Sequence, residues 1–299
     1  MSKKLVSLFL ALLMMFSMAP GSLLAESSTI TVTDMFGRKV TIEGPVTRVI
    51  AIEPSDCEIL CAIGCEDALV GRGEYCDYPA SVQELPAVQA GWNTNLEEML
   101  ALNPQVVILS DMNDTPEMVE LLESNGVCVI VTDPNSIEEV YVNIRLLGAV
   151  MGKAAEAEAV ITDMQATFAD IASKSAKTDK TIYFEVMPLE WGLWSAGANT
   201  FMHELAEICG MKNAFADIDG WQQVSQEQVI ERDPDYIVLV TGMGESAVDE
   251  VLGRMGWGEM KAIQNGAVFN ADSYAMTRPA PRLMEAAQDL YNFLNSITE

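Results

Sequence analysis

The stretch Trp92-Asn-Thr-Asn-Leu-Glu97 is followed by Pro104 and the apolar run Val106-Val-Ile-Leu109, and the same arrangement returns later in the chain. The second copy is Trp221-Gln-Gln-Val-Ser-Gln-Glu227, then Pro234 and Tyr236-Ile-Val-Leu239. In both copies the glutamate lies seven residues before the proline, and the apolar run starts two residues after it. Each copy predicts a loop tryptophan, a helix with the glutamate in its first turn, and a buried strand. Two copies predict two lobes of similar architecture.

Further apolar runs rich in valine and isoleucine lie on both sides of these copies. They are Arg48–Ile52, Cys128–Val131, Thr181–Val186 and Ala267–Phe269. Helix-like segments, such as 96–102, 116–124 and 226–232, lie between the runs. Strands that alternate with helices are typical of α/β layers with mostly parallel sheets, so we expect two Rossmann-like lobes.

Two shorter features frame this pattern. Ile30–Asp34 and Lys39–Ile42 predict an edge hairpin with Gly37 in its turn. Between the two copies, apolar residues from Ile137 onward follow helical spacing, and no proline interrupts them up to Ser173. We expect one long helix of about 35 residues, roughly 50 Å in length, and two helices with a kink at Gly152 are the alternative.

The linking helix, residues 137–174, would separate an N-terminal lobe, residues 26–136, from a C-terminal lobe, residues 175–299. Residues 1–25 have the order of a secretory signal peptide, since Lys3 and Lys4 precede an apolar run from Leu5 to Ala19 and small or apolar residues end at Ala25. We therefore expect export to the periplasm or to the outer face of the cell membrane. No cysteine lies near the cleavage point, so a lipid anchor is not expected.

The charge of the chain limits its partners. Lysine and arginine number 17 against 44 aspartates and glutamates, which gives a net charge of −27. A surface this acidic repels phosphate backbones and anionic lipids, so nucleic acid is not an expected partner. A bare divalent metal is not expected either, because such sites favour clusters of histidine and carboxylate and His203 is the single histidine.

Six cysteines could form disulfides in an exported chain. Cys57, Cys61 and Cys65 lie four residues apart and are predicted to share one helix, where β-carbons about 5–6 Å apart exceed the roughly 3.5–4.5 Å of a disulfide. A thiolate metal site is the alternative, but a buried helix face is favoured because free cysteine packs as a small apolar residue. Whether any of the six cysteines pair is left open.

Seven segments occur in an order that identifies a family. They are Val32–Ile42, Arg48–Leu60, Asp77–Pro79, Asn95–Glu97, Leu102–Pro104, Ser195–Gly197 and Arg278–Arg282. This order, over nearly the whole mature chain, resembles the helical-backbone (class III) solute-binding proteins of ABC importers, the receptors for cobalamin, haem and ferric siderophores. The resemblance implies two lobes joined by one long rigid helix. It also implies a monomer with no enzymatic activity and no resident cofactor, whose partners are a permease and, through it, an ATPase.

Within that family, the vitamin B12-binding branch is the closest likeness. Its aromatic Asp-Tyr-Pro segment matches Tyr75-Cys-Asp-Tyr-Pro79, and three further aromatic positions match Trp92, Trp194 and Trp221. Its late polar segment matches Arg278 and, at a longer spacing, Asp272, for which Tyr274 is an alternative. The resemblance implies that these residues bind a corrinoid, cobalamin or cobinamide, since aromatic walls suit a flat ring with an apolar rim.

Several neighbouring residues have other expected roles. Trp191 flanks the same loop as Trp194 and could share its role, whereas Trp257 is interpreted as structural in a surface region. Arg282 is expected to anchor the last helix by an ion pair. The family docks one surface carboxylate of each lobe onto arginines of the permease, and the matching residues here are Glu97 and Glu227, with Glu58 and Glu204 less favoured.

Two alternatives remain open. The receptor could bind haem or a ferric siderophore, for which Tyr75, Tyr78 and Tyr274 offer phenolates. The second alternative is an enzyme of the chelatase type with two similar lobes. A single histidine, a signal peptide and the lack of a nucleophile elbow around Ser195 argue against it.

Overall fold

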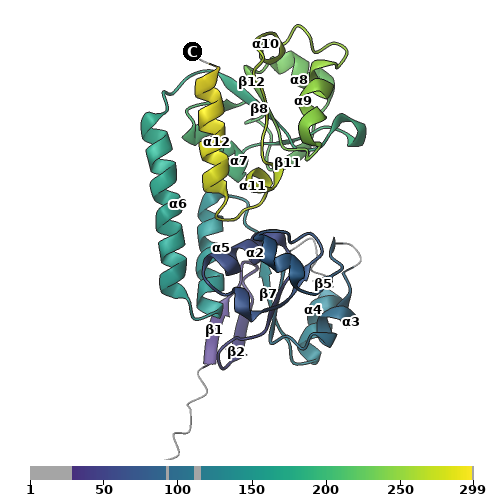
Figure 1. The fold of residues 1–299 in the computed structure, drawn as a ribbon, viewed down its shortest axis with the longest axis vertical. Helices are drawn as coiled ribbons and strands as arrows, with labels where there is room; N and C mark the ends of the chain where they lie inside the picture. The colour runs from purple at the N-terminus through teal and green to yellow at the C-terminus, as the bar shows by residue number, and fades with distance from the viewer. Residues whose placement is uncertain (1–28, 92–93, 111–115, 298–299) are drawn as a thin grey trace, which may run out of the picture.

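The computed structural model describes residues 29–91, 94–110 and 116–297 and arranges them as two α/β lobes (Figure 1). The expected signal peptide and Trp92 lie outside the described residues. In the described ranges, no helix is long and apolar enough to cross a membrane. The expected fold class, two lobes with mostly parallel sheets, is confirmed.

The N-terminal lobe is built on a five-stranded parallel sheet in the order β5-β4-β3-β6-β7. Its strands are β3 (Val49–Ala51), β4 (Leu69–Gly73), β5 (Ala87–Val88), β6 (Val106–Ser110) and β7 (Cys128–Thr132). Its helices are α2 (Pro54–Ala62), α3 (Leu96–Ala101) and α4 (Pro116–Ser124), with 3-10 turns at Glu66–Ala68 and Ala80–Glu84. The central strands are buried on both faces, which explains their continuous valine and isoleucine runs.

The C-terminal lobe has a four-stranded parallel sheet in the order β10-β8-β12-β13. The strands are β8 (Thr181–Glu185), β10 (Lys212–Asn213), β12 (Tyr236–Leu239) and β13 (Val268–Asn270), and a separate antiparallel ribbon pairs β9 (Trp194–Ala196) with β11 (Trp221–Gln223). The helices are α7 (Phe201–Ile208), α8 (Gln226–Arg232), α9 (Ala247–Leu252), α10 (Lys261–Gln264), α11 (Ser273–Thr277) and α12 (Leu283–Ser296), with 3-10 turns at Leu189–Trp191 and Gly244–Ser246.

The duplicated unit of the sequence is also duplicated in space. Asn95 accepts hydrogen bonds from the first turn of α3, and Ser225 caps α8 in the same way. After each helix, the residue immediately before the proline has a positive φ, 48° at Asn103 and 42° at Asp233. The strands that follow, β6 and β12, lie inside their sheets. The repeat therefore encodes the same helix-to-strand connection in both lobes.

The expected hairpin is confirmed. β1 (Thr29–Thr33) pairs antiparallel with β2 (Lys39–Glu43), and Gly37 has a φ of 76° in the turn, a value that glycine adopts readily. The hairpin forms its own two-stranded sheet. The amide of Met35 donates to the carbonyl oxygen of Val131 at 3.2 Å, which attaches the turn to β7.

The expectation of one helix over residues 137–174 is wrong, and the alternative of two helices divided at Gly152 is confirmed, with a reversal of the chain in place of a kink. The segment forms two helices, α5 (Ile137–Val150) and α6 (Ala154–Lys174), because Gly152 adopts a φ of 67° and the chain reverses there. A β-carbon on Gly148 would lie 2.5 Å from Ala157 Cβ, so this glycine lets the two helices pack closely. The connecting element is α6, about 31 Å long at 1.5 Å per residue, which runs along one side of both lobes (Figure 1).

One apolar core is continuous across the two lobes. It includes Ile59 on α2, Ile144 on α5, Phe168 on α6 and Leu290 on α12. Each lobe has a further core on the other face of its sheet. Trp257 belongs to the C-terminal one and is completely buried, so it is structural as expected but does not lie at the surface.

Candidate functional site

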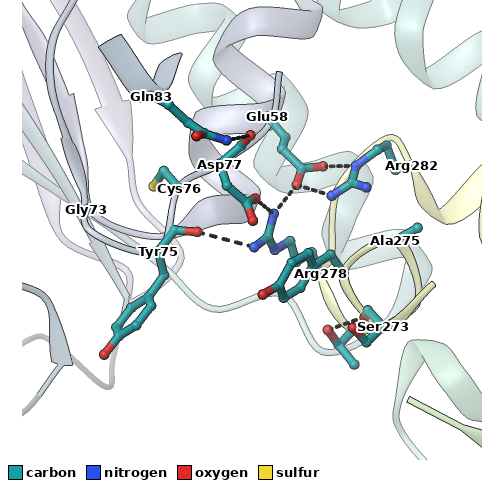
Figure 2. Close-up of polar contacts among 12 residues, drawn as sticks. Glu58, Gly73, Tyr75, Cys76, Asp77, Gln83, Ser273, Ala275, Arg278 and Arg282 are labelled. Atoms are coloured by element: carbon teal, nitrogen blue, oxygen red, sulfur yellow. Dashed lines mark hydrogen bonds and ion pairs between the residues drawn. The ribbon is translucent and has the colours of Figure 1, made fainter. Parts of the chain in front are cut away.

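A cluster of ion pairs joins the lobes beside α2 and α12 (Figure 2). Glu58, on α2, is 3% exposed and accepts from Arg282 at 2.8 and 2.7 Å. Arg278 donates to Glu58 at 2.9 Å, to Asp77 at 2.6 Å and to the carbonyl oxygen of Tyr75 at 3.2 Å. The N-terminal lobe thus supplies the carboxylates that accept these hydrogen bonds, and the C-terminal lobe supplies both cations.

Tyrosine rings cover this interlobe cluster. The guanidinium carbon of Arg278 lies 4.2 Å from the ring centroid of Tyr274, and that of Arg282 lies 4.1 Å from the ring centroid of Tyr78. Burial alone would lower the pKa of Arg278, but Asp77 and Glu58 raise it above its ordinary value. Arg282 anchors the start of the last helix as the sequence predicts. Glu58 is buried within this cluster, so its candidacy as a surface docking carboxylate is wrong.

A second polar contact between the lobes lies at the start of α5. The carbonyl oxygen of Asn135 accepts from the amide of Phe201 at 2.6 Å, and its side-chain oxygen accepts from Trp221 Nε1 at 3.4 Å. Glu204 accepts from the amide of Ile137 at 2.6 Å. Burial raises the pKa of the Glu204 carboxyl, and this engaged side chain is not a free surface carboxylate either.

The predicted aromatic residues take different positions. Tyr75 follows β4, is 64% exposed, and directs its ring away from the ion pairs (Figure 2). Trp194 is 36% exposed on β9 and Trp191 is 66% exposed just before it. Trp221 begins strand β11, so its predicted loop position is wrong, and it is half-buried against Phe201, with ring centroids 5.3 Å apart. Trp194 and Trp221 lie on the same face of the β9–β11 ribbon, because Trp221 pairs with Ala196, two residues from Trp194.

The two predicted polar ligand residues already have partners in the protein. Arg278 is 8% exposed and belongs to the interlobe cluster. Asp272 caps α11 by accepting from the amides of Tyr274 and Ala275, and its second oxygen lies 3.7 Å from Arg282. Their proposed contacts with a ligand remain predictions, as does that of Trp92.

The predicted docking carboxylates occupy equivalent positions. Glu97 is the second residue of α3 and Glu227 is the second residue of α8, and both are exposed. Hydrogen bonds with its own backbone and with Ser225 hold the pKa of Glu227 below its usual range. The structure brings the two glutamates to matching places on the two lobes.

Sequence reasoning missed a buried acid, Asp56 on α2. Its carboxyl accepts from Thr132 Oγ1 and Asn143 Nδ2, both at 2.8 Å. Burial raises its pKa to about 7. Thr132 Oγ1 also lies 3.3 Å from the carbonyl oxygen of Leu109. Because a hydroxyl has one proton, Thr132 can donate to Asp56 or to Leu109 but not to both at once. No sequence signal distinguishes Asp56 from a solvated first-turn carboxylate.

Metal ligands are not gathered in the described part of the chain, where no group of three or more His, Cys, Asp or Glu could hold an ion. His203 Nε2 lies 3.6 Å from Glu207 on the same helix. All six cysteines are free, and hydrogen bonds with the thiols of Cys61 and Cys76, together with burial, raise the pKa of Cys57. Cys65 lies beyond the end of α2, so the predicted helix carries only Cys57 and Cys61.

Comparison with known proteins identifies the family. Residues 49–275 match the family described as periplasmic binding protein. An ABC transporter substrate-binding lipoprotein of Bacillus subtilis (strain 168) is 32% identical over 89% of this chain and 85% of its own length. The vitamin B12-binding protein of Salmonella choleraesuis is 30% identical over 84% of this chain and 91% of its own.

Solved structures agree. The periplasmic vitamin B12 binding protein of Vibrio cholerae has a TM-score of 0.72 at 26% identity, over 85% of this chain and 99% of its own. Haem-binding proteins share the fold at identities below 25%, a likeness of fold alone. Because the Bacillus subtilis relative is a lipoprotein, the expected lack of a lipid anchor is not confirmed. The chain belongs to the periplasmic binding protein family, whose members act outside the cytoplasm as the substrate-binding components of ABC importers and are not enzymes.

Proposed function

We propose that this receptor captures a corrinoid between its two lobes and delivers it to an ABC permease. The observation that carries the proposal is a set of exposed aromatic rings on both lobes. Tyr75 is 64% exposed after β4, and Trp191 and Trp194 are 66% and 36% exposed beside the β9–β11 ribbon. A corrin is a broad flat ring with an apolar rim, so burying it against such rings is favourable.

The relatives support the same ligand class. A protein named for vitamin B12 binding is 30% identical over 84% of this chain. Tyr75, Trp194 and Trp221 are the described aromatic positions that carry this likeness, and Trp92 is the fourth. A corrin also carries amide arms, which need polar partners. Rotation of the Asp77 side chain, which is 34% exposed, would free an N–H of Arg278 for such an arm while Arg278 keeps its bond to Glu58.

Haem or a ferric siderophore is the second candidate ligand. The phenols of Tyr75 and Tyr274 are 64% and 52% exposed, and a phenolate can bind ferric iron. An anionic siderophore would favour free arginines, whereas Arg278 and Arg282 are both paired with Glu58. His203 is on a helix beside Glu207, with its side chain 19% exposed, and suits haem poorly.

Delivery requires a partner rather than chemistry. Glu97 and Glu227 would each meet a basic group of the permease, a complementarity that sets orientation and encounter rate. The packing of α6 against both lobes and the interlobe cluster favour only small movements between them. Docking would then separate the lobes and release the ligand, with energy from ATP hydrolysed by a separate subunit.

A titration tests the ligand. Purified protein is titrated with cyanocobalamin, cobinamide, haemin and a ferric siderophore, and tryptophan fluorescence and ligand absorbance are followed. We expect saturable quenching by a corrinoid at one ligand per chain, and weaker quenching and binding in Trp194→Leu. The control is Lys39→Gln, on β2 of the hairpin, which should bind as wild type does. Saturable binding of haemin or the siderophore alone would establish the second candidate instead.

A further inference from the structure

A methionine in the turn after α9 is almost completely exposed. Met255 has 94% of its surface in contact with solvent, the largest fraction among the large apolar side chains that the structure describes. Single exposed apolar residues are common at protein surfaces. Exposure alone therefore does not indicate a binding surface, and the residues around Met255 must be considered.

Two buried anchors hold the turn on either side of Met255. Arg254, one residue before, is 7% exposed and donates to both carboxylate oxygens of Glu185 at 2.7 Å. Trp257, two residues after, is completely buried and donates through Nε1 to Gln226 at 3.2 Å. The guanidinium carbon of Arg254 lies 4.5 Å from the ring centroid of Trp257. The turn is therefore fixed by packing, and that packing presents Met255 to solvent.

The turn lies against α8, the helix that carries Glu227. Gln226, the partner of Trp257, directly precedes Glu227. Ile230 lies three residues after Glu227, on the same face of the helix, and a β-carbon on Gly256 would lie 3.7 Å from its Cδ1. Ile230 is 36% exposed, and Leu252 at the end of α9 is 44% exposed. We call Ile230, Leu252 and Met255 the apolar patch.

Exposed acids lie close to the apolar patch in the chain. Besides Glu227, they are Glu231, Asp249 and Glu259, and they outnumber the one exposed cation of the same stretch, Lys261, which pairs with Asp233 at 3.2 Å. An apolar centre with a polar rim is the usual anatomy of a protein interface. The acidic rim requires a basic partner surface. A second copy of this chain, with a net charge of −27, would be repelled.

We propose that the apolar patch and its acidic rim form a docking surface for the outer face of the ABC permease, with Met255 inserted into an apolar pocket bordered by lysine or arginine. The proposal rests on the proposed delivery function and extends the contact of the C-terminal lobe beyond Glu227. Methionine suits this role because its unbranched side chain adapts to an irregular pocket.

The variant Met255→Asp tests the proposal in liposomes that contain the permease–ATPase complex stimulated by the wild-type receptor. We expect the receptor concentration for half-maximal ATPase stimulation to rise about tenfold or more, as for loss of an interface hot spot. Met255→Leu should stay within about threefold of wild type. The matched control is Val142→Asp, 43% exposed on α5, which should act as wild type. Ligand affinity and melting temperature should be unchanged in all three variants.

An unchanged half-maximal concentration in Met255→Asp would overturn the proposal, even if charge reversal at Glu227 weakens docking. Failure of the wild type to bind any metal chelate would instead overturn the proposed function.

Peroxide footprinting gives a second readout that needs no mutation. Docking should slow oxidation of Met255 to the sulfoxide severalfold, and equal rates in the free and docked receptor would contradict the proposal. Self-association of the receptor that Met255→Asp abolishes would assign the patch to a second copy instead.

Discussion

The two lobes contain the same duplicated helix-to-strand unit, but their buried carboxylates differ in whether an arginine pairs with them. In the N-terminal lobe, Asp56 is buried without a cation, and burial raises its pKa to about 7. In the C-terminal lobe, Glu185 is 1% exposed and receives two hydrogen bonds from Arg254. Between the lobes, Glu58 of the first is paired with two arginines of the second. The duplicated unit therefore gives both lobes a similar backbone. It does not determine which buried carboxylates have an arginine partner.

Breaking the interlobe cluster should have the largest effect on stability. Glu58→Ala leaves Arg278 and Arg282 buried without their shared carboxylate, so we expect a loss of about 3–5 kcal/mol in the free energy of unfolding. Equilibrium denaturation in urea measures the change. Glu97→Ala, at an exposed position, is the control and should stay within about 0.5 kcal/mol of wild type. A loss below about 1 kcal/mol in Glu58→Ala would show that the cluster does not hold the lobes together.

Neutral substitutions of Asp56 and Glu185 should change the free energy of unfolding in opposite directions. The folded-state pKa of Asp56 is about 7, above roughly 3.9 in an unfolded chain. The unfolded chain therefore loses this proton first, and wild-type stability falls between about pH 4 and pH 7. Asp56→Asn mimics the neutral acid, so its free energy of unfolding should exceed that of wild type increasingly as pH rises, by up to about 4 kcal/mol at pH 8.

The matched variant is Glu185→Gln. Its free energy of unfolding should fall by about 3 kcal/mol at pH 8, because Arg254 keeps only Glu250 as an ionic partner. Thermal unfolding at pH 5 and pH 8 measures both variants against wild type. If the stability difference between Asp56→Asn and wild type is the same at the two pH values, Asp56 is ionised in the folded protein and our interpretation fails.

Reversing the equivalent surface charges should affect delivery and leave the fold intact. Glu97→Lys combined with Glu227→Lys places two cations opposite basic groups of the permease, at a cost of about 2 kcal/mol or more in docking. Stimulated transport into vesicles should be abolished, with ligand binding unchanged. The control is Glu43→Lys combined with Asp163→Lys, two exposed acids on β2 and α6. Normal transport by the Glu97/Glu227 double variant would remove both residues from the interface.

The smallest effects should come from the helix ends of the duplicated unit. Residue 103 has a φ of 48°, which alanine disfavours, so Asn103→Ala should lower the free energy of unfolding by about 1 kcal/mol. Asp233→Ala adds the loss of the hydrogen bond that Asp233 accepts from the amide of Lys261 at 2.8 Å, so it should cost about 0.5–1 kcal/mol more. Urea unfolding of both variants measures the difference. Equal costs would mean that the contact with Lys261 adds nothing to the C-terminal copy.

Much of the fold follows from local sequence signals. Apolar runs after a proline, such as Val106–Leu109 and Tyr236–Leu239, predict buried strands because such runs suit a parallel sheet covered on both faces. A break at Gly152 was one of the two predictions, but the sequence could not decide between them, because a glycine in a helical pattern can have a negative φ, as Gly148 does within α5, or a positive one. The final conformation depends on the packing of α6 against α5.

The candidate site was predictable only in part. The matching places of Glu97 and Glu227 follow from the repeat, since helix position depends on nearby residues. The partner of Arg278 could not be predicted, because Glu58 lies 220 residues away in the chain and no local pattern joins them. Burial of Asp56 and Trp257 likewise depends on neighbours distant in sequence. The ligand contact of Arg278 stays a prediction, whereas the structure shows its pairing with Glu58 and Asp77 between the lobes.

The position of cobalt in a crystal grown with cyanocobalamin tests the central claim most directly. Anomalous scattering at the cobalt edge locates the metal without reference to the fitted ring. We predict one cobalt per chain between the two lobes, with the corrin ring against Tyr75 on one side and the β9–β11 ribbon on the other. Cobalt at any other place, or no bound cobalt in protein that takes up haemin or a ferric siderophore, would contradict the account.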